Sequence, residues 1–132
     1  MIATHAESQS ADRSHKFSPC PDSPNCVSSQ STDKRHFIEP LNYTGDIADA
    51  RKKLIDILEN TKRVNLRKAG MNYIHAEFRS SIFRFIDDVE FSFPTDKNII
   101  HVKSASRKGY YDFGANRRRA ERLRVTFDKW VK

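Results

Sequence analysis

The amino-acid sequence predicts a two-layer α+β domain, in which two helices pack on one face of a mainly antiparallel sheet of about five strands. Segments with alternating apolar residues follow one another through short turns between residues 64 and 106, as in strands that pair antiparallel. One amphipathic helical pattern precedes these segments and another follows them. The chain has 132 residues, and we expect residues 17–132 to form a single domain after a disordered tail at residues 1–16.

A short strand and a helix are the first predicted elements. Residues 36–43 contain the apolar pair Phe37 and Ile38 and predict the strand. Asp46 is a suitable N-cap for the helix that follows, because its side chain can accept a backbone N–H. Apolar residues then recur at three- and four-residue steps and predict one buried stripe, namely Ile47, Ala50, Leu54, Ile57 and Leu58.

Alternation between apolar and polar residues predicts the strands of the sheet. Val64 and Leu66 alternate with polar neighbours, and residues 73–79 form the next segment. A long strand is expected over residues 82–93, because its apolar residues fall on one face. These residues are Phe83, Phe85, Val89, Phe91 and Phe93.

Residues 99–106 are predicted to be the return strand of a hairpin that turns at residues 95–98. This turn pairs residues whose numbers sum to about 193, so we expect Phe91 near Val102. The second helix is expected to begin at Asn116. Its apolar stripe is Ala120, Leu123, Phe127, Trp130 and Val131. The core predicted from both helices and the sheet is Leu54, Leu58, Phe85, Phe91, Leu123 and Phe127.

The charge of the chain is concentrated near its C-terminus. The net charge is +7, and residues 103–132 account for all of it, with ten Lys or Arg against three Asp or Glu. No apolar run approaches the roughly 18 residues that cross a bilayer. Residues 1–18 lack the apolar centre of a signal peptide. We therefore expect a cytoplasmic protein with no transmembrane segment.

Cys20 and Cys26 lie close together in the turn-rich segment CPDSPNC. They supply at best half of a zinc site, so we expect no metal and no other cofactor. A disulfide between them and a pair of free thiols in a reducing compartment are both consistent with the spacing. In either case we expect their α-carbons to lie within about 7 Å of each other.

Three unusual stretches occur in the same chain. They are CPDSPNCVSS at residues 20–29, FRFIDDVEF at residues 83–91, and SASRKGYYDFGANRRRAERLR at residues 104–124. With these stretches the chain resembles the bacterial and plastid family that carries domain of unknown function number 1499. The resemblance covers nearly the whole chain after the tail, and it implies a family but no assigned activity. Members of that family often carry an N-terminal membrane or export segment.

Asp87 falls on the apolar face of the long strand by alternation, where an unpaired carboxylate is costly. Either a β-bulge turns this side chain outward, or a basic partner meets it. The hairpin register places Asp87 opposite Ser106, beside Arg107. We therefore expect Asp87 or Asp88 to contact Arg107 or Arg117, in a cluster that joins the sheet to the C-terminal helix.

The loop before the second helix has the composition of an anion-binding site. A glycine-containing loop that leads into a helix presents free N–H groups and the positive end of the helix dipole. Arginine side chains add planar donors that suit carboxylate or phosphate. The candidate ligand-binding residues are Arg107, Asp112, Asn116, Arg117, Asp87 and Asp88. The alternative is that Asp112 or Asn116 only caps the helix.

These observations favour a non-enzymatic binding or accessory domain that accepts a small anionic ligand or an acidic protein surface near the start of the C-terminal helix. The first alternative is a hydrolase-like enzyme with Asp87 and Asp88 as its acid–base pair, which requires a concave pocket around them. Nucleic-acid binding through the Arg-rich helix ranks third, because the sequence contains no known nucleic-acid-binding motif.

Overall fold

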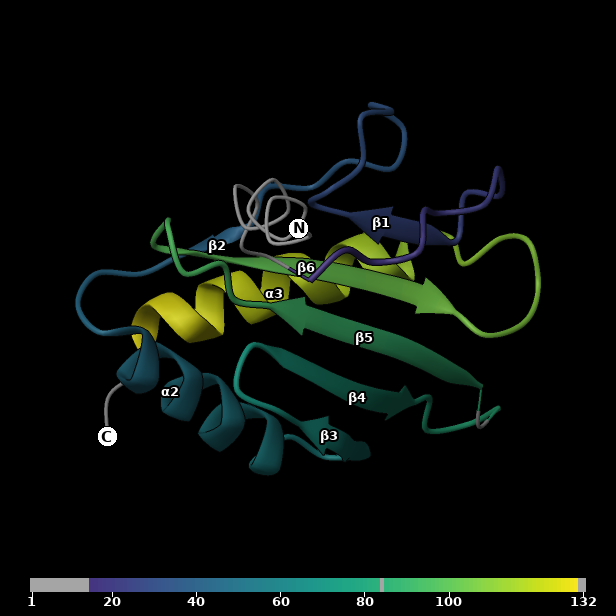
Figure 1. The fold of residues 1–132 in the computed structure, drawn as a ribbon. Helices are drawn as coiled ribbons and strands as arrows, with labels where there is room; N and C mark the ends of the chain where they lie inside the picture. The colour runs from purple at the N-terminus through teal and green to yellow at the C-terminus, as the bar shows by residue number, and fades with distance from the viewer. Residues whose placement is uncertain (1–14, 84, 131–132) are drawn as a thin grey trace, which may run out of the picture.

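The computed structural model describes residues 15–83 and 85–130 as one antiparallel sheet with two helices (Figure 1). The strands are β1 (Cys26–Ser28), β2 (Leu41–Asn42), β3 (Val64–Ala69), β4 (Tyr73–Arg79), β5 (Ile86–Ser92) and β6 (Ile99–Ser106). The helices are α2 (Ile47–Glu59) and α3 (Ala115–Lys129). The predicted α+β class is confirmed, with six strands instead of about five.

The sheet has the order β1-β6-β5-β4-β3, and β2 also pairs with β6. Every paired strand is antiparallel to its neighbour. The predicted hairpin is confirmed, since Phe91 pairs with Val102 and Asp87 pairs with Ser106. This register is favoured because it puts Val89, Phe91 and Val102 together on the buried face of the sheet.

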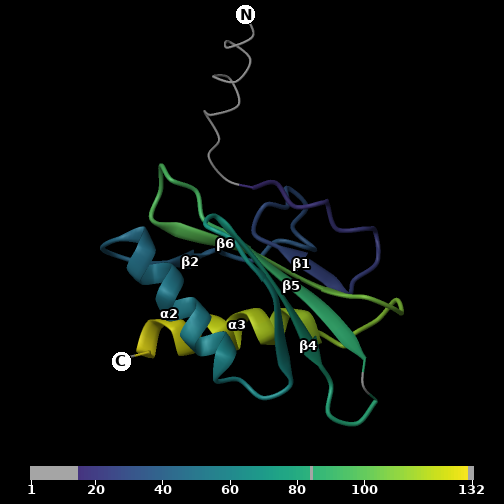
Figure 2. The ribbon, with the colours of Figure 1, turned by 60° about the horizontal axis from the view of Figure 1, so that its bottom comes forward.

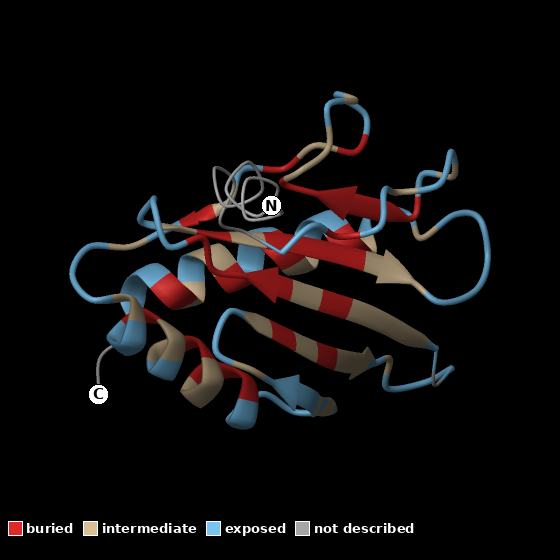
Figure 3. Ribbon diagram, viewed as in Figure 1, coloured by how far each residue is buried: buried red, intermediate tan, exposed pale blue. Residues whose placement is uncertain are grey.

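Both helices cover one face of the sheet, and the core lies between these two layers (Figure 2). Red and paler positions alternate along β4 and β5 in Figure 3, because successive side chains point to opposite faces. The fully or almost fully buried core includes Leu54, Leu58, Ile74, Val89, Phe91, Val102 and Phe127. In the described part of the chain, no helix is long and apolar enough to cross a membrane.

The predicted core is correct except at Phe85, whose exposed fraction is 61%. Strand β5 begins at Ile86, four residues later than the alternation predicted. Ser80 closes the β4–β5 connection at this point, because its N–H donates to the carbonyl of Phe85 and its Oγ accepts the N–H of Phe85. Phe83 and Phe85 therefore belong to a loop outside the layers, although they share the spacing of the strand.

The segment before α2 differs most from the prediction. Only Leu41–Asn42 of the predicted strand 36–43 forms a strand, while Phe37 makes an isolated bridge to Ser28. Strand β1 was not predicted, because three residues are too few for a period to be visible. Cys20 and Cys26 form a disulfide with α-carbons 5.7 Å apart, which confirms the expected distance.

The expected tail and the last helical residue fall largely outside the described residues. Residues 1–14 and Val131 are not described. His15, near the end of the expected tail, lies against the sheet: its N–H donates to Ser92 Oγ at 2.8 Å, and its ring centroid is 4.3 Å from that of Tyr73. Contacts with the sheet therefore begin before residue 17.

Candidate anion-binding site

Asp87 and Asp88 point to opposite faces of the sheet, since they are consecutive residues of β5. Asp87 shares the helix-covered face with Val89 and Phe91, whereas Asp88 lies on the open face. Of the two alternatives considered for Asp87, the β-bulge does not form, because the strand pairs regularly on both sides of this residue. The two carboxylates therefore do not form one acid–base pair.

Asp88 contacts Arg107, as predicted. Arg107 Nη2 lies 2.6 Å from Asp88 Oδ1 and 2.9 Å from Glu77 Oε2, and Arg107 Nε lies 3.0 Å from Asp88 Oδ2. His75 Nε2 lies 2.9 Å from Asp88 Oδ1. Burial favours a higher pKa for Asp88, but the hydrogen bonds from Arg107 and His75 outweigh it and hold the pKa below its usual value. We call these four residues the open-face network.

Asp87 joins the sheet to α3 through a different arginine. Arg119 Nη1 lies 2.8 Å from Asp87 Oδ2, and each side chain is 13% exposed. The predicted link between sheet and helix thus exists, but Arg119 makes it. Arg107 belongs to the open-face network and Arg117 donates to the carbonyls of Arg35 and Phe37, so the predicted contact of Asp88 with Arg107 is present but does not join the sheet to the helix.

Asp112 and Asn116 organise the start of α3. The carboxylate of Asp112 accepts the N–H of Gly114 at 2.9 Å and the N–H of Asn116 at 3.0 Å, which is the capping role considered above. The amide of Asn116 is fully buried, accepts from Ser104 Oγ, and donates to Ser106 Oγ and to Asp112. The positive end of the helix therefore faces a carboxylate of the chain itself.

A strongly basic pocket lies one turn further along α3. It has a volume of about 380 Å³ and opens between the end of α2, the end of β4 and the middle of α3. The residues that line it include no Asp or Glu and five cations, namely Lys62, Arg63, Arg79, Arg119 and Arg122. Ser80, Thr61 and Thr126 add hydroxyl groups to its wall. We call it the basic pocket.

Arg119 is the anchored member of the basic pocket. Its guanidinium lies over the ring of Phe78, 5.0 Å from the centroid, and its Nη1 also donates to Asn116 Oδ1 at 3.0 Å. Burial lowers the pKa of Arg119, while Asp87 favours the charged form. Its Nε is buried and has no hydrogen-bond partner among the described residues. Such an orphaned donor costs about 1–3 kcal/mol.

The other four cations of the basic pocket have no anionic partner within residues 15–83 and 85–130. Among the described residues, Lys62, Arg63, Arg79 and Arg122 form no salt bridge. Arg63 also adopts φ 61°, a left-handed conformation that is unfavourable for a residue with a Cβ. A strained backbone and uncompensated like charges in one pocket both lower the stability of the fold.

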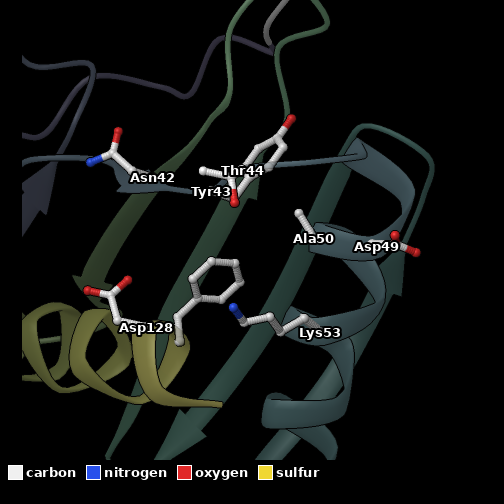
Figure 4. Close-up of a pocket in the computed structure, with 8 residues that line it drawn as sticks. Asn42, Tyr43, Thr44, Asp49, Ala50, Lys53 and Asp128 are labelled. Atoms are coloured by element: carbon white, nitrogen blue, oxygen red, sulfur yellow. The ribbon is translucent and has the colours of Figure 1, made fainter. Parts of the chain in front are cut away.

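A second pocket has mixed charge (Figure 4). It has a volume of about 440 Å³ and lies between β2, the start of α2 and the end of α3. Asp49 and Asp128 outnumber its one lysine, Lys53, whose Nζ lies 4.1 Å from the ring centroid of Phe127. This pocket therefore has one more carboxylate than cation and suits an anionic ligand less well than the basic pocket does.

Comparison with protein families shows which family the chain belongs to. The family model described as "Protein of unknown function (DUF1499)" matches residues 16–127. The chain belongs to the DUF1499 family. Within the set of curated proteins, none matches the chain. The resemblance drawn from the sequence is therefore confirmed, and the match within this DUF1499 chain covers every residue of the basic pocket.

Sequence reasoning about this DUF1499 chain missed the basic pocket because its cations come from three separate segments. Lys62 and Arg63 follow α2, Arg79 ends β4, and the remaining two lie on α3. The Arg-rich helix was noticed, but its periodicity alone does not say which arginines face other cations. A usable signal was that Arg119 and Arg122 are three residues apart and thus share one helical face.

Proposed function

We propose that this domain is a non-enzymatic binding module that accepts a small anionic ligand, such as a phosphate group, in the basic pocket. The observation that carries the proposal is that five cationic side chains line one pocket with no acidic side chain among them. Arginine suits this role because its planar donors match the oxygens of phosphate, sulfate and carboxylate. The sequence predicted an anion at the first turn of α3, and the proposed site lies at the second turn of the same helix.

The electrostatics of the pocket support this position over the predicted one. At the start of α3, Asp112 accepts the first N–H groups, and Arg107 is paired with two carboxylates. In the basic pocket, four cations lack such a partner within the described residues, so an anion there would relieve their mutual repulsion. An anion therefore gains more at the basic pocket than at the helix start.

Thermal unfolding with added anions tests the proposal. A ligand that binds the folded state stabilises it by about 2.7 kcal/mol at 100 times its Kd. We expect phosphate and sulfate to raise the Tm of the wild type more than chloride does at equal ionic strength. Arg79→Gln and Arg122→Gln are expected to remove most of this specific increase, because they leave the fold intact and remove donors at the pocket.

Lys97→Gln is the matched control, since it also removes one positive charge but lies in the exposed turn between β5 and β6. It is expected to keep the full phosphate effect. Equal losses in Arg79→Gln and Lys97→Gln would mean that phosphate acts on net charge alone, and the proposed pocket would then be rejected. A single-stranded oligonucleotide that binds far more tightly than phosphate would favour the nucleic-acid alternative.

An acid–base site is the second candidate, and the contact between His75 and Asp88 favours it. Their atoms are 2.9 Å apart, and each side chain is 27% exposed on the open face. A carboxylate that orients an imidazole is the arrangement used by many hydrolases. Turnover of a nitrophenyl ester or phosphate that disappears in His75→Gln would support this candidate, and the absence of turnover in the wild type would remove it.

A further inference from the structure

Large apolar side chains are exposed mainly at one end of the molecule. Among the described residues, eight large apolar side chains are at least 50% exposed. Six of them lie in two loops: Ile82, Phe83, Phe85, Tyr110, Tyr111 and Phe113. The other two, Met71 and Val125, lie elsewhere. Single exposed apolar residues are normal on a protein surface, but six in two loops mark an interaction site.

The two loops leave the same end of the sheet. The first joins β4 to β5 and the second joins β6 to α3 (Figure 1). Their bases are joined directly, because the N–H of Arg107 donates to the carbonyl of Ile86 at 3.0 Å. We call the six exposed side chains the aromatic end.

Within each loop the rings associate with one another and not with the core. The ring centroids of Phe83 and Phe85 are 5.5 Å apart, and those of Tyr110 and Tyr111 are 4.8 Å apart. All four rings are more than half exposed. The fold therefore gains little from them, which points to a role outside the chain.

The surroundings of the aromatic end are positively charged. Arg79 and Lys108 lie at the beginnings of the two loops, and Arg118 donates to the carbonyl of Phe113 at 2.6 Å. The one acidic residue in the sequence of these loops, Asp112, accepts N–H groups at the start of α3. The end of the molecule thus combines apolar side chains with cations.

The basic pocket adjoins this end. Arg79 and Ser80 line the pocket and lead into the first loop, so one of the pocket cations is carried by the same hairpin as Phe83 and Phe85. A bilayer of anionic phospholipid offers the matching order of chemistry, with phosphates outside and hydrocarbon beneath. Phe and Tyr are well suited to the boundary between the two.

We propose that the aromatic end inserts into the headgroup region of an anionic phospholipid bilayer, with the basic pocket facing the lipid phosphates. The assignment of phosphate to the pocket rests on the proposed function, whereas the docking itself rests on the exposed loops and their charge. A bilayer fits better than a protein surface because the six side chains project from two separate loop tips. A protein partner would need a continuous complementary surface.

Vesicle co-sedimentation tests this proposal. We expect the wild type to bind vesicles of phosphatidylcholine mixed with phosphatidylglycerol, and to bind vesicles of phosphatidylcholine alone at least ten-fold more weakly. The double variants Phe83→Ser/Phe85→Ser and Tyr111→Ser/Phe113→Ser are each expected to reduce binding about ten-fold or more, because each removes two large apolar side chains whose burial in the bilayer favours binding. Circular dichroism checks that these exposed substitutions leave the fold intact.

Met71→Ser/Val125→Ser is the matched control, since it removes two equally exposed apolar side chains away from the aromatic end. It is expected to bind vesicles like the wild type. The aromatic variants are also expected to keep the phosphate-dependent increase in Tm. If the wild type does not bind vesicles but its Tm still rises with phosphate, membrane docking is rejected and the anion pocket is retained. If it binds vesicles but phosphate has no effect on its Tm, the anion pocket is rejected and membrane docking is retained.

A fluorescent reporter locates the contact. Trp130 is the single tryptophan of the chain, so Phe83→Trp in a Trp130→Phe background reports on one loop only. We expect its emission to shift to the blue and to be quenched by lipids brominated on the acyl chain, while Trp130 in the wild type is not quenched. The wild type could instead fail to bind vesicles and form a dimer that Phe83→Ser/Phe85→Ser abolishes. That result would overturn the bilayer proposal and identify a second copy of the chain as the partner of the aromatic end.

Discussion

The two faces of the sheet place the same chemistry in opposite environments. On the covered face, Asp87 pairs with Arg119, and each side chain is 13% exposed. On the open face, Asp88 pairs with Arg107, which is 43% exposed. Because a buried ion depends on its partner far more than an exposed one does, the first pair fixes the packing of α3 and the second adds little to it.

The two faces also differ in whether their cations are available to bind an anion. In the open-face network the single arginine, Arg107, is paired with two carboxylates, those of Asp88 and Glu77. The covered face leads to the basic pocket, where Arg119 is the one cation with an anionic partner in the described part of the chain. The cation is therefore paired on the open face, whereas positive charge is in excess at the basic pocket.

Arg119→Ala is expected to have the largest effect on stability. It leaves the buried carboxylate of Asp87 without a partner, which costs about 3–5 kcal/mol. Urea unfolding measures the loss. The double variant Asp87→Leu/Arg119→Met is expected to recover most of it, because two apolar side chains leave no buried charge. A loss below about 1 kcal/mol for Arg119→Ala would show that the pair is in effect exposed and would remove the contrast between the faces.

Arg63→Gly tests whether the strained backbone at the basic pocket is linked to anion binding. Arg63 holds a left-handed conformation that glycine adopts freely, so the substitution is expected to raise the stability by up to about 1 kcal/mol. The same change removes one cation of the basic pocket and is expected to reduce the phosphate-dependent increase in Tm. Lys68→Gly, at an exposed and paired position of β3, is the control, because there glycine is expected to destabilise the strand. Unchanged stability together with an unchanged phosphate effect would contradict the view that Arg63 keeps an unfavourable backbone conformation because its cation binds the ligand.

How far the sequence predicts this molecule depends on the range of the interaction. The hairpin of β5 and β6 and the cap at Asp112 are local, and they were expected. The start of β5 was placed too early because alternation continues through Phe85, although the β4–β5 hairpin closes at Ser80. The choice of Arg119 over Arg117 for Asp87 depends on how α3 lies across the sheet, which no local pattern encodes.

Arg107→Ala tests the open face directly and is expected to lower stability by much less than Arg119→Ala. Its side chain is partly exposed, and Asp88 keeps its contact with His75 after the substitution. We further expect the loss to shrink in high salt, because salt screens exposed charges and hardly affects buried ones. Urea unfolding at low and high ionic strength gives both values. An Arg107→Ala variant as unstable as Arg119→Ala would mean that the two faces do not differ.

The acid limb of the stability curve distinguishes the faces without a change of packing. Hydrogen bonds from Arg107 hold the pKa of Glu77 below its usual value, and burial, although it acts the other way, does not prevent the same result for Asp88. A carboxyl whose pKa is lower in the folded state contributes stability above its unfolded pKa and loses it as the pH falls through the folded pKa.

We therefore expect the wild type to lose stability as the pH falls below about 5. Asp88→Asn is expected to flatten this loss, because the amide does not titrate and still accepts from Arg107. Urea unfolding at several pH values compares the slopes. Asp96→Asn also removes one carboxyl, but in the exposed turn between β5 and β6 outside the open-face network, so it is expected to leave the slope near that of the wild type. An Asp88→Asn curve parallel to that of the wild type would show that Asp88 contributes nothing to the acid limb. The loss would then have to come from other carboxylates, such as Asp112, whose pKa the hydrogen bonds at the start of α3 hold down against the effect of burial.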